Sequence, residues 1–248
     1  MVATQPLPTE RTHHTSDPIA DVAAVFKALR VPAGVYAPQE DSRLLLTALA
    51  ERDLVAQRRV LDLCSGSGVL AIGAAVLGAG EVTAFDISAP AVACATDNAI
   101  ALGVEIDARQ GSLPEALAQG PYDVVVSNPP YVPDSNALPP KLGLSRAWHG
   151  GRDGRSLLDP LCVVAPDLLS DRGTMLLVQS EFAGVERSLT MLRAGGLHAR
   201  VVERQRIAFG PVLTANARWL ETVGMLERGR RFEELCVIRA DKPAGSGT

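Results

Sequence analysis

Aromatic residues are scarce in this chain, at 4% of its 248 residues, with only two tryptophans and three tyrosines. Proteins that bind single-stranded nucleic acid usually stack bases on aromatic side chains along a basic groove. The net charge of −4 also argues against a surface held to nucleic acid mainly by counterion release, although an acidic average does not exclude a local basic patch. Composition therefore favours a protein or a small molecule as substrate.

The chain also lacks the cysteine spacing of a metal site. Its cysteines are far apart, without a C-x-x-C pair, at Cys64, Cys94, Cys162 and Cys236. We expect neither a bound metal nor a disulfide framework, and each cysteine should be a small buried apolar residue. No apolar run approaches membrane-spanning length, and the N-terminus has no apolar stretch like that of a signal peptide. We expect a protein of the reducing cytoplasm that does not contact a membrane.

One domain is expected between two disordered ends. Residues 1–16 are polar and rich in proline and threonine, which predicts a disordered leader, and residues 242–248 should form a disordered tail. With 47% hydrophobic composition, residues 17–241 can bury one substantial core. Residues 17–55 should form N-terminal helices, because Asp17 can cap a helix whose first turn contains Pro18.

From residue 60 onward, strand-like and helix-like segments alternate. The expected strands lie near 60–64, 81–86, 105–110, 123–128, 173–180, 197–205 and 233–240. The expected helices lie at 68–78, 88–102, 156–170 and 181–194. This alternation predicts an α/β fold, a Rossmann-like, seven-stranded, mostly parallel sheet with helices on both faces.

An insertion at 208–231 separates the last two expected strands. It contains a helical stretch around 214–226 and a basic cluster, Arg228, Arg230 and Arg231. Loops on such sheets often carry specificity, so the insertion is either a substrate or partner contact or a solvated charged turn.

Two motifs follow expected strands, where open α/β sheets bind ligands. After the strand at 60–64, Gly66 and Gly68 form a turn in which backbone can approach a ligand and a helix can pack tightly. Asp86 ends the next strand, where a carboxylate can accept both ribose hydroxyls of a nucleoside. The glycines also satisfy the looser dinucleotide fingerprint, but a carboxylate at Asp62, just before the turn, would repel a pyrophosphate. An adenosyl ligand without phosphates fits better.

The second motif is Asn128-Pro129-Pro130-Tyr131, after the apolar run 123–127. An amide NH₂ is a poor nucleophile because its lone pair is delocalised into the carbonyl. Asn128 Oδ1 and the Pro129 carbonyl can each accept one N–H of such a group, which aims the lone pair at a methyl donor. Pro129 and Pro130 stiffen the loop, and Tyr131 can stack on a planar group. No strong general base is needed, because the leaving group is a neutral thioether, so we expect no catalytic histidine.

With these motifs the chain resembles the class I S-adenosylmethionine-dependent methyltransferases, and among them the HemK-like glutamine N5-methyltransferases of peptide chain release factors. The likeness covers about residues 30–240 and includes two further segments, Val35 to Ser42 and Trp148 to Gly154. The second of these should shape the target pocket. The chain looks like the short, single-domain branch of archaea and eukaryotes, whose members work with a small zinc-binding activator subunit.

The resemblance also implies which residues hold the cofactor, S-adenosylmethionine. With the two turn glycines, Gly66 and Gly68, the implied lining residues are Ser42, Asp62, Cys64, Asp86, Ser112, Leu113 and Asn128. Cys64 stands where many relatives have glycine, and Ser42 keeps the hydroxyl of the family's common threonine. Ser112 replaces a common acidic residue, so recognition of the adenine amino group should use a hydroxyl or the backbone.

The resemblance and the chemistry leave several substrates open. The leading prediction is a glutamine side chain in the Gly-Gly-Gln loop of a release factor. The amino group of adenine is also a planar, conjugated NH₂, so adenine N6 in DNA or RNA is the alternative, and a small molecule is the third. A non-catalytic scaffold for a partner subunit has little support, because Asn128 and Tyr131 are both intact.

Overall fold

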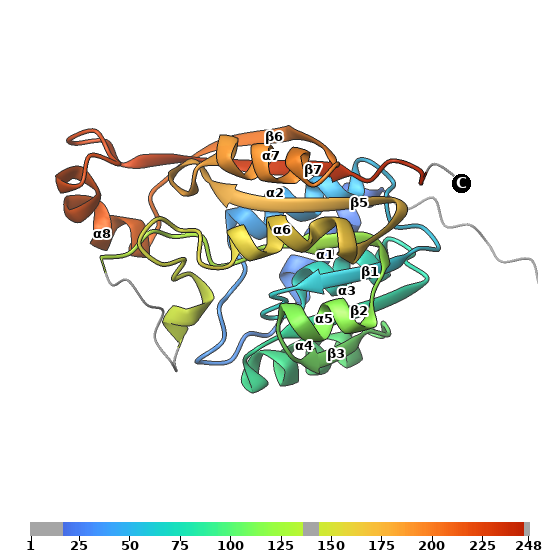
Figure 1. Cartoon of the computed structure of the whole chain (residues 1–248). Helices are drawn as coiled ribbons and strands as arrows, with labels where there is room; N and C mark the ends of the chain where they lie inside the picture. The colour runs from blue at the N-terminus through green and yellow to red at the C-terminus, as the bar shows by residue number, and fades with distance from the viewer. Residues whose placement is uncertain (1–16, 136–143, 246–248) are drawn as a thin grey trace, which may run out of the picture.

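A computed structural model describes residues 17–135 and 144–245. The leader expected at 1–16 and the last three residues of the expected tail lie outside the described residues. The described chain forms one seven-stranded sheet in the order β3-β2-β1-β4-β5-β7-β6 (Figure 1). The strands are β1 (Arg59–Leu63), β2 (Glu81–Asp86), β3 (Asp107–Gln110), β4 (Tyr122–Ser127), β5 (Leu169–Ser180), β6 (His198–Ala208) and β7 (Phe232–Asp241). Only β7 runs antiparallel to its neighbours, which confirms the predicted, mostly parallel sheet.

Eight α-helices and two short 3₁₀ helices accompany the described strands. The α-helices are α1 (Pro18–Ala28), α2 (Glu40–Ala50), α3 (Val69–Val76), α4 (Ala89–Leu102), α5 (Leu113–Gln119), α6 (Leu158–Leu168), α7 (Val185–Ala194) and α8 (Pro211–Thr222). The 3₁₀ helices are η1 (Leu144–Ala147) and η2 (Glu181–Ala183). In the described residues no helix is both long and apolar enough to span a bilayer.

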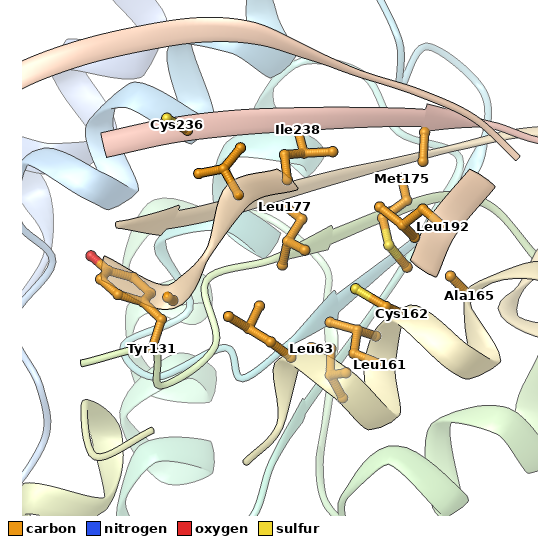
Figure 2. Close-up of a cluster of buried hydrophobic side chains, with 14 of the residues drawn as sticks. Leu63, Tyr131, Leu161, Cys162, Ala165, Met175, Leu177, Leu192, Cys236 and Ile238 are labelled. Atoms are coloured by element: carbon orange, nitrogen blue, oxygen red, sulfur yellow. The ribbon is translucent and has the colours of Figure 1, made fainter. Parts of the chain in front are cut away.

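Alternating side chains along the strands build two cores, one on each face of the sheet. On β4, Val124 and Val126 join the core that includes α1, α2 and α3, whereas Val125 joins the core that includes α5, α6, α7 and α8. This period of two, with apolar residues on both sides, is what a sheet covered on both faces requires. Figure 2 shows part of the second core, with the Tyr131 ring at one end of the cluster.

Some element boundaries differ from those expected. The predicted helix at 156–170 ends at Leu168, because Leu169 already pairs with Tyr122 as the first residue of β5. Gly173 therefore lies inside a strand, where an added Cβ would approach the Ser170 and Tyr122 carbonyl oxygens to 2.8 and 3.1 Å. The helix of the insertion begins earlier than expected, since Pro211 suits the first helical turn. Helix α5 was not predicted.

Parallel pairing places the predicted motifs at one edge of the sheet. Leu63 of β1 is in register with Phe85 of β2 and with Ser127 of β4. The segments that follow these residues therefore emerge side by side. Their convergence forms the site.

Candidate active site

A cavity of about 610 Å³ opens at the carboxyl ends of β1, β2 and β4. Its volume lies within the range of small-molecule sites, roughly 300–1,000 Å³. Most of the residues expected to hold the cofactor or the acceptor line this cavity, namely Ser42, Cys64, Gly66, Asp86, Ser112, Leu113, Asn128, Pro129, Pro130 and Tyr131. The structure thus brings together residues from positions 42 to 131 of the chain.

Two of the expected residues, Asp62 and Gly68, do not line the cavity but lie behind the Gly-rich turn. Asp62 is fully buried, and its Oδ2 accepts the Ala71 backbone N–H at 3.0 Å. Gly68 has φ +82°, and an added Cβ would lie 2.8 Å from Ala95 Cβ. Asp62 therefore ties β1 to α3, and Gly68 lets the turn pack against α4.

Burial disfavours the charged form of the Asp62 carboxyl. Desolvation, opposed by the Ala71 hydrogen bond and assisted by the nearby charge of Asp86, raises its pKa from 3.8 to about 7. Its Oδ1 has no hydrogen-bond partner within the described chain. A buried acceptor without a partner costs free energy, which favours a protonated carboxyl or a donor supplied by a ligand.

The turn itself presents backbone to the cavity. Cys64 has φ +69° and Gly66 φ +53°, and the N–H groups of Cys64 and Ser65 both donate to the Phe85 carbonyl, at 2.9 and 3.1 Å. Burial, with the charges of Asp86 and Asp62, raises the pKa of the Cys64 thiol well above its ordinary value. The thiol therefore stays protonated and is no nucleophile.

Asp86 is the fixed carboxylate of the cavity wall. Its Oδ2 accepts the Gly66 N–H at 2.9 Å and its Oδ1 accepts the Ser88 N–H at 2.8 Å. Each oxygen keeps a free lone pair, so the pair can accept two vicinal hydroxyls without rearrangement. Burial raises the pKa of Asp86, opposed by these backbone hydrogen bonds and by Arg146.

Ser112, the expected contact to the adenine amino group, is partly used by the protein. Its hydroxyl donates to Glu115 Oε2 at 2.7 Å, and its backbone N–H donates to the same atom at 2.8 Å. The hydroxyl oxygen can still accept a hydrogen bond from an amino group.

On the opposite wall, Asn128 and Tyr131 are both held by the N-terminal end of α2. Asn128 Nδ2 donates to Ser42 Oγ at 3.1 Å. The Tyr131 hydroxyl donates to Asp41 Oδ2 at 2.9 Å, and burial together with Asp41 raises the pKa of Tyr131 well above its ordinary value. The resemblance includes Asp41 in its first segment, Val35 to Ser42, but no sequence pattern signals its contact with Tyr131, 90 residues away.

The segment Trp148–Gly154 lies along the backbone that follows the motif. Val132 N–H donates to the Trp148 carbonyl and Gly150 N–H donates to the Val132 carbonyl, both at 2.9 Å. Gly154 has φ +75°, and an added Cβ would lie 2.3 Å from the Tyr131 carbonyl oxygen. Only glycine fits this close approach, so Gly154 lets the segment pack directly against the backbone of the motif.

The rim of the cavity carries two rings from the segments of the resemblance, with a buried acid nearby that sequence reasoning did not assign. The Tyr36 and Trp148 rings lie 6.0 Å apart at an interplanar angle of 52°, and both line the cavity. Glu233 is buried nearby, and desolvation raises its pKa from 4.5 to about 7. No spacing in the sequence signals Glu233, since β7 brings it to the site from the far end of the chain.

The insertion is more structured than a solvated turn. The Arg230 guanidinium lies over the Phe182 and Phe232 rings and pairs with Glu181, and Arg231 pairs with Glu221. Helix α8 lies beyond the carboxyl end of β5 (Figure 1). From α8, Asn216 Nδ2 donates to the Pro133 carbonyl at 3.3 Å, so the insertion contacts the segment just after the motif.

The residues present fit S-adenosylmethionine. The carboxylate of Asp86 is fixed and has free lone pairs for the ribose hydroxyls, and backbone of the Gly-rich turn reaches the cavity. On the opposite wall, the Asn128 amide is held through one N–H, which leaves its oxygen available.

Comparisons with known proteins agree with this geometry. The family model of the methyltransferase small domain matches residues 28–139. A "Putative protein N5-glutamine methyltransferase" of Methanocaldococcus jannaschii is 32% identical over 189 residues, 76% of this chain and 94% of that protein. The methyltransferase HEMK2 of Homo sapiens is 36% identical over 172 residues, 66% of this chain and 79% of that protein.

Solved structures share the fold at lower identity. The Mtq2–Trm112 complex of E. cuniculi, responsible for methylation of the eRF1 translation termination factor, matches with a TM-score of 0.54 and 23% identity over 84% of this chain and 99% of that chain. The 16S rRNA N2 G1207 methyltransferase of T. Thermophilus, in complex with AdoMet and guanosine, matches with a TM-score of 0.53 and 24% identity over 84% of this chain and 45% of that chain. These neighbours confirm the class I methyltransferase fold. The chain therefore belongs to the HemK-like glutamine N5-methyltransferase family and is an S-adenosylmethionine-dependent methyltransferase.

Proposed function

We propose that this enzyme methylates the side-chain amide nitrogen of a glutamine in a protein, and that a peptide chain release factor is its substrate. One observation carries the proposal. The Asn128 amide is fixed by the hydrogen bond from its Nδ2 to Ser42 Oγ, which leaves Oδ1 to accept an N–H in the cavity that Asp86 also lines.

The chemistry follows from how these residues treat a planar NH₂. S-adenosylmethionine supplies an electrophilic methyl group on a sulfonium centre. Asn128 Oδ1 and the Pro129 carbonyl accept the two N–H bonds of the acceptor, so its nitrogen lone pair points out of the amide plane toward the methyl group. The Tyr131 ring, whose hydroxyl is held by Asp41, lines the same cavity and can stack on the planar amide. Catalysis is then mainly orientation, and the nitrogen loses its proton to water during or after transfer.

Relatives support glutamine over adenine. Proteins similar to this chain are named release factor glutamine methyltransferase, as in Deinococcus radiodurans at 34% identity, and ribosomal protein uL3 glutamine methyltransferase, as in Bordetella pertussis at 40% identity. The match to the latter covers 45% of that protein's length. Because its name gives a ribosomal protein as substrate, a ribosomal protein is the second protein to test. With 4% aromatic residues and a net charge of −4, the chain is a poor match to the stacking and basic tracks used on nucleic acid.

We further propose that residues 17–241 act as one catalytic domain, with its substrate in the cytoplasm and a small zinc-binding activator as partner. The activator is supported by the Mtq2–Trm112 complex, whose methyltransferase shares this fold. Purification of the chain alone and with such a subunit would test it, since dependence on the activator predicts higher solubility and activity for the pair.

The proposed function is tested by labelling. The purified protein, alone and with an activator subunit, is incubated with methyl-labelled S-adenosylmethionine and an extract of cells that lack this enzyme. The labelled products are then divided into two portions, one digested with protease and the other with nuclease. Label lost only to protease, in a band of release-factor size, supports the proposal. Label lost only to nuclease overturns it in favour of adenine, and label in a ribosomal protein would change the substrate.

A further inference from the structure

We infer that Asp41 is a positioning residue that sets the orientation of the Asn128 amide through Ser42. The inference rests on the proposed function, since it explains how Asn128 presents an oxygen to a planar NH₂ acceptor. In the described chain, no hydrogen bond joins Asp41 to the amide of Asn128. Asp41 therefore acts through the Ser42 hydroxyl, which contacts both side chains.

The hydrogen bonds form a branched network at the start of α2. Ser42 donates its backbone N–H to Asp41 Oδ1 at 2.6 Å and its hydroxyl to the same oxygen at 3.3 Å. Ser42 Oγ accepts from Asn128 Nδ2 at 3.1 Å. On the other branch, Asp41 Oδ2 accepts the Tyr131 hydroxyl at 2.9 Å. Asp41, which is 6% exposed, thus contacts both Ser42, which holds Asn128, and the Tyr131 hydroxyl.

The direction of each hydrogen bond fixes the next. An ionised carboxylate can only accept, so the single hydroxyl hydrogen of Ser42 is directed to Asp41. The Ser42 oxygen then has only lone pairs for Asn128, so Asn128 must turn its NH₂ toward Ser42. Its Oδ1 is left for the acceptor N–H. If the Asn128 amide were flipped, its NH₂ would face the NH₂ of the substrate. Both groups are donors, so no hydrogen bond could form between them.

Replacing Asp41 by asparagine removes this direction while keeping the shape. The new amide can donate to Ser42 Oγ, which frees the Ser42 hydroxyl to donate to Asn128 Oδ1. Both orientations of Asn128 then have partners, and only one presents an acceptor to the substrate. The same change also removes a negative charge from the first turn of α2, where an acid stabilises the helix. The test therefore needs a second readout.

A matched control lies next to Asp41. Glu40 is also an acid in the first turn of α2, its side chain is 51% exposed, and it pairs only loosely with Arg43 at 4.0 Å. The Glu40→Gln variant therefore loses a similar helix-end charge without touching the Ser42 network.

The first readout needs no substrate. The side-chain amide resonance of Asn128 is assigned in a ¹⁵N spectrum by its absence in Asn128→Ala. We expect Asp41→Asn and Ser42→Ala to shift this resonance in the same direction, and Glu40→Gln to leave it in place. A resonance that moves in Ser42→Ala but not in Asp41→Asn would overturn the inference.

The second readout is kinetic, at saturating cofactor with a glutamine peptide. Asp41→Asn should lower kcat roughly 10- to 100-fold with little change in the KM for peptide, because misorientation costs transition-state rather than ground-state contacts. The double variant Asp41→Asn/Ser42→Ala should lose no more than the worse single variant, since both act on one hydrogen-bond chain. Additive losses, or an unchanged kcat in Asp41→Asn, would contradict the network. If the wild type fails to methylate glutamine, the proposed function fails, but the amide resonance still decides the role of Asp41.

Discussion

The two halves of the cavity are built in different ways. The half proposed for the cofactor is built mainly from one continuous stretch, Asp62 to Asp86, in which strand, turn, helix and strand follow each other, with Ser112 and Leu113 added after β3. The acceptor half joins Asn128 to Ser42, Tyr131 to Asp41 and Val132 to Trp148, across separations of 86, 90 and 16 residues. The residues proposed for the cofactor are therefore placed mainly by local structure, whereas those proposed for the acceptor depend on tertiary packing. Changes in the two halves should therefore separate affinity for the cofactor from the rate of transfer.

The largest effect is expected in the acceptor half. Asn128→Ala should lower kcat by about 10²- to 10³-fold, the cost of losing one well-placed polar group at a reacting centre. Cofactor affinity, measured by calorimetry, should change far less, because the Asp86 side of the cavity is untouched. Equal losses of cofactor affinity and of kcat would show that the two halves are not separate.

The reverse outcome is expected in the cofactor half. Asp86→Asn should weaken cofactor binding by roughly 1.5–3 kcal/mol, the value of hydrogen bonds to a charged group. At saturating cofactor, kcat should remain near that of the wild type. Asp97→Asn, an exposed acid on α4, serves as the control and should leave both quantities unchanged.

Close packing in the acceptor half can be broken at a glycine. Gly154→Ala adds a Cβ 2.3 Å from the Tyr131 carbonyl oxygen at φ +75°. We expect a loss of unfolding free energy of about 1–3 kcal/mol together with a lower kcat, since the motif must move. Gly224 has φ +76° and nothing within 4 Å of an added Cβ, so Gly224→Ala measures the backbone strain alone. Similar losses in both variants would remove the close contact as the cause.

A pH dependence of stability is also expected, from the two buried acids Asp62 and Glu233. Burial raises the pKa values of Asp62 and Glu233 to about 7. The folded state therefore holds protons that the unfolded chain releases near pH 4, so stability from both groups is full below pH 4 and is lost as pH rises toward 7. Each carboxyl should cost about 1.4 kcal/mol per pH unit in this window at most.

Thermal melts between pH 4 and 8 would check this. Asp62→Asn and Glu233→Gln should each flatten the decline of the melting temperature toward pH 7. If the melting temperature of the variants falls with pH as steeply as that of the wild type, these acids titrate normally in the folded protein.

Sequence reasoning performed differently on the two halves as well. Periodicity and glycine placement were enough for the sheet, the Gly-rich turn and Asp86, because each signal lies within a few residues of the structure it encodes. Asp41 and Tyr36 lie in a segment of the resemblance, Val35 to Ser42, but their contacts with Tyr131 and Trp148 were not foreseen, and Glu233 was not assigned, since these contacts come from elements distant in sequence. Helix α5 was missed because it is short, and the start of β5 was misplaced because a helix passes into the strand without a loop. The roles assigned to all the site residues stay predictions, and two of these residues, Asp62 and Gly68, lie behind the cavity wall rather than on it.

The central claim is that Asn128 presents an oxygen to the NH₂ of a glutamine. The most direct measurement is tandem mass spectrometry of a release factor after reaction with the wild-type enzyme and with Asn128→Ala. The account predicts one added methyl group on a single glutamine side chain with the wild type and none with the variant. A methyl group on any other residue, or equal methylation by the variant, would contradict it.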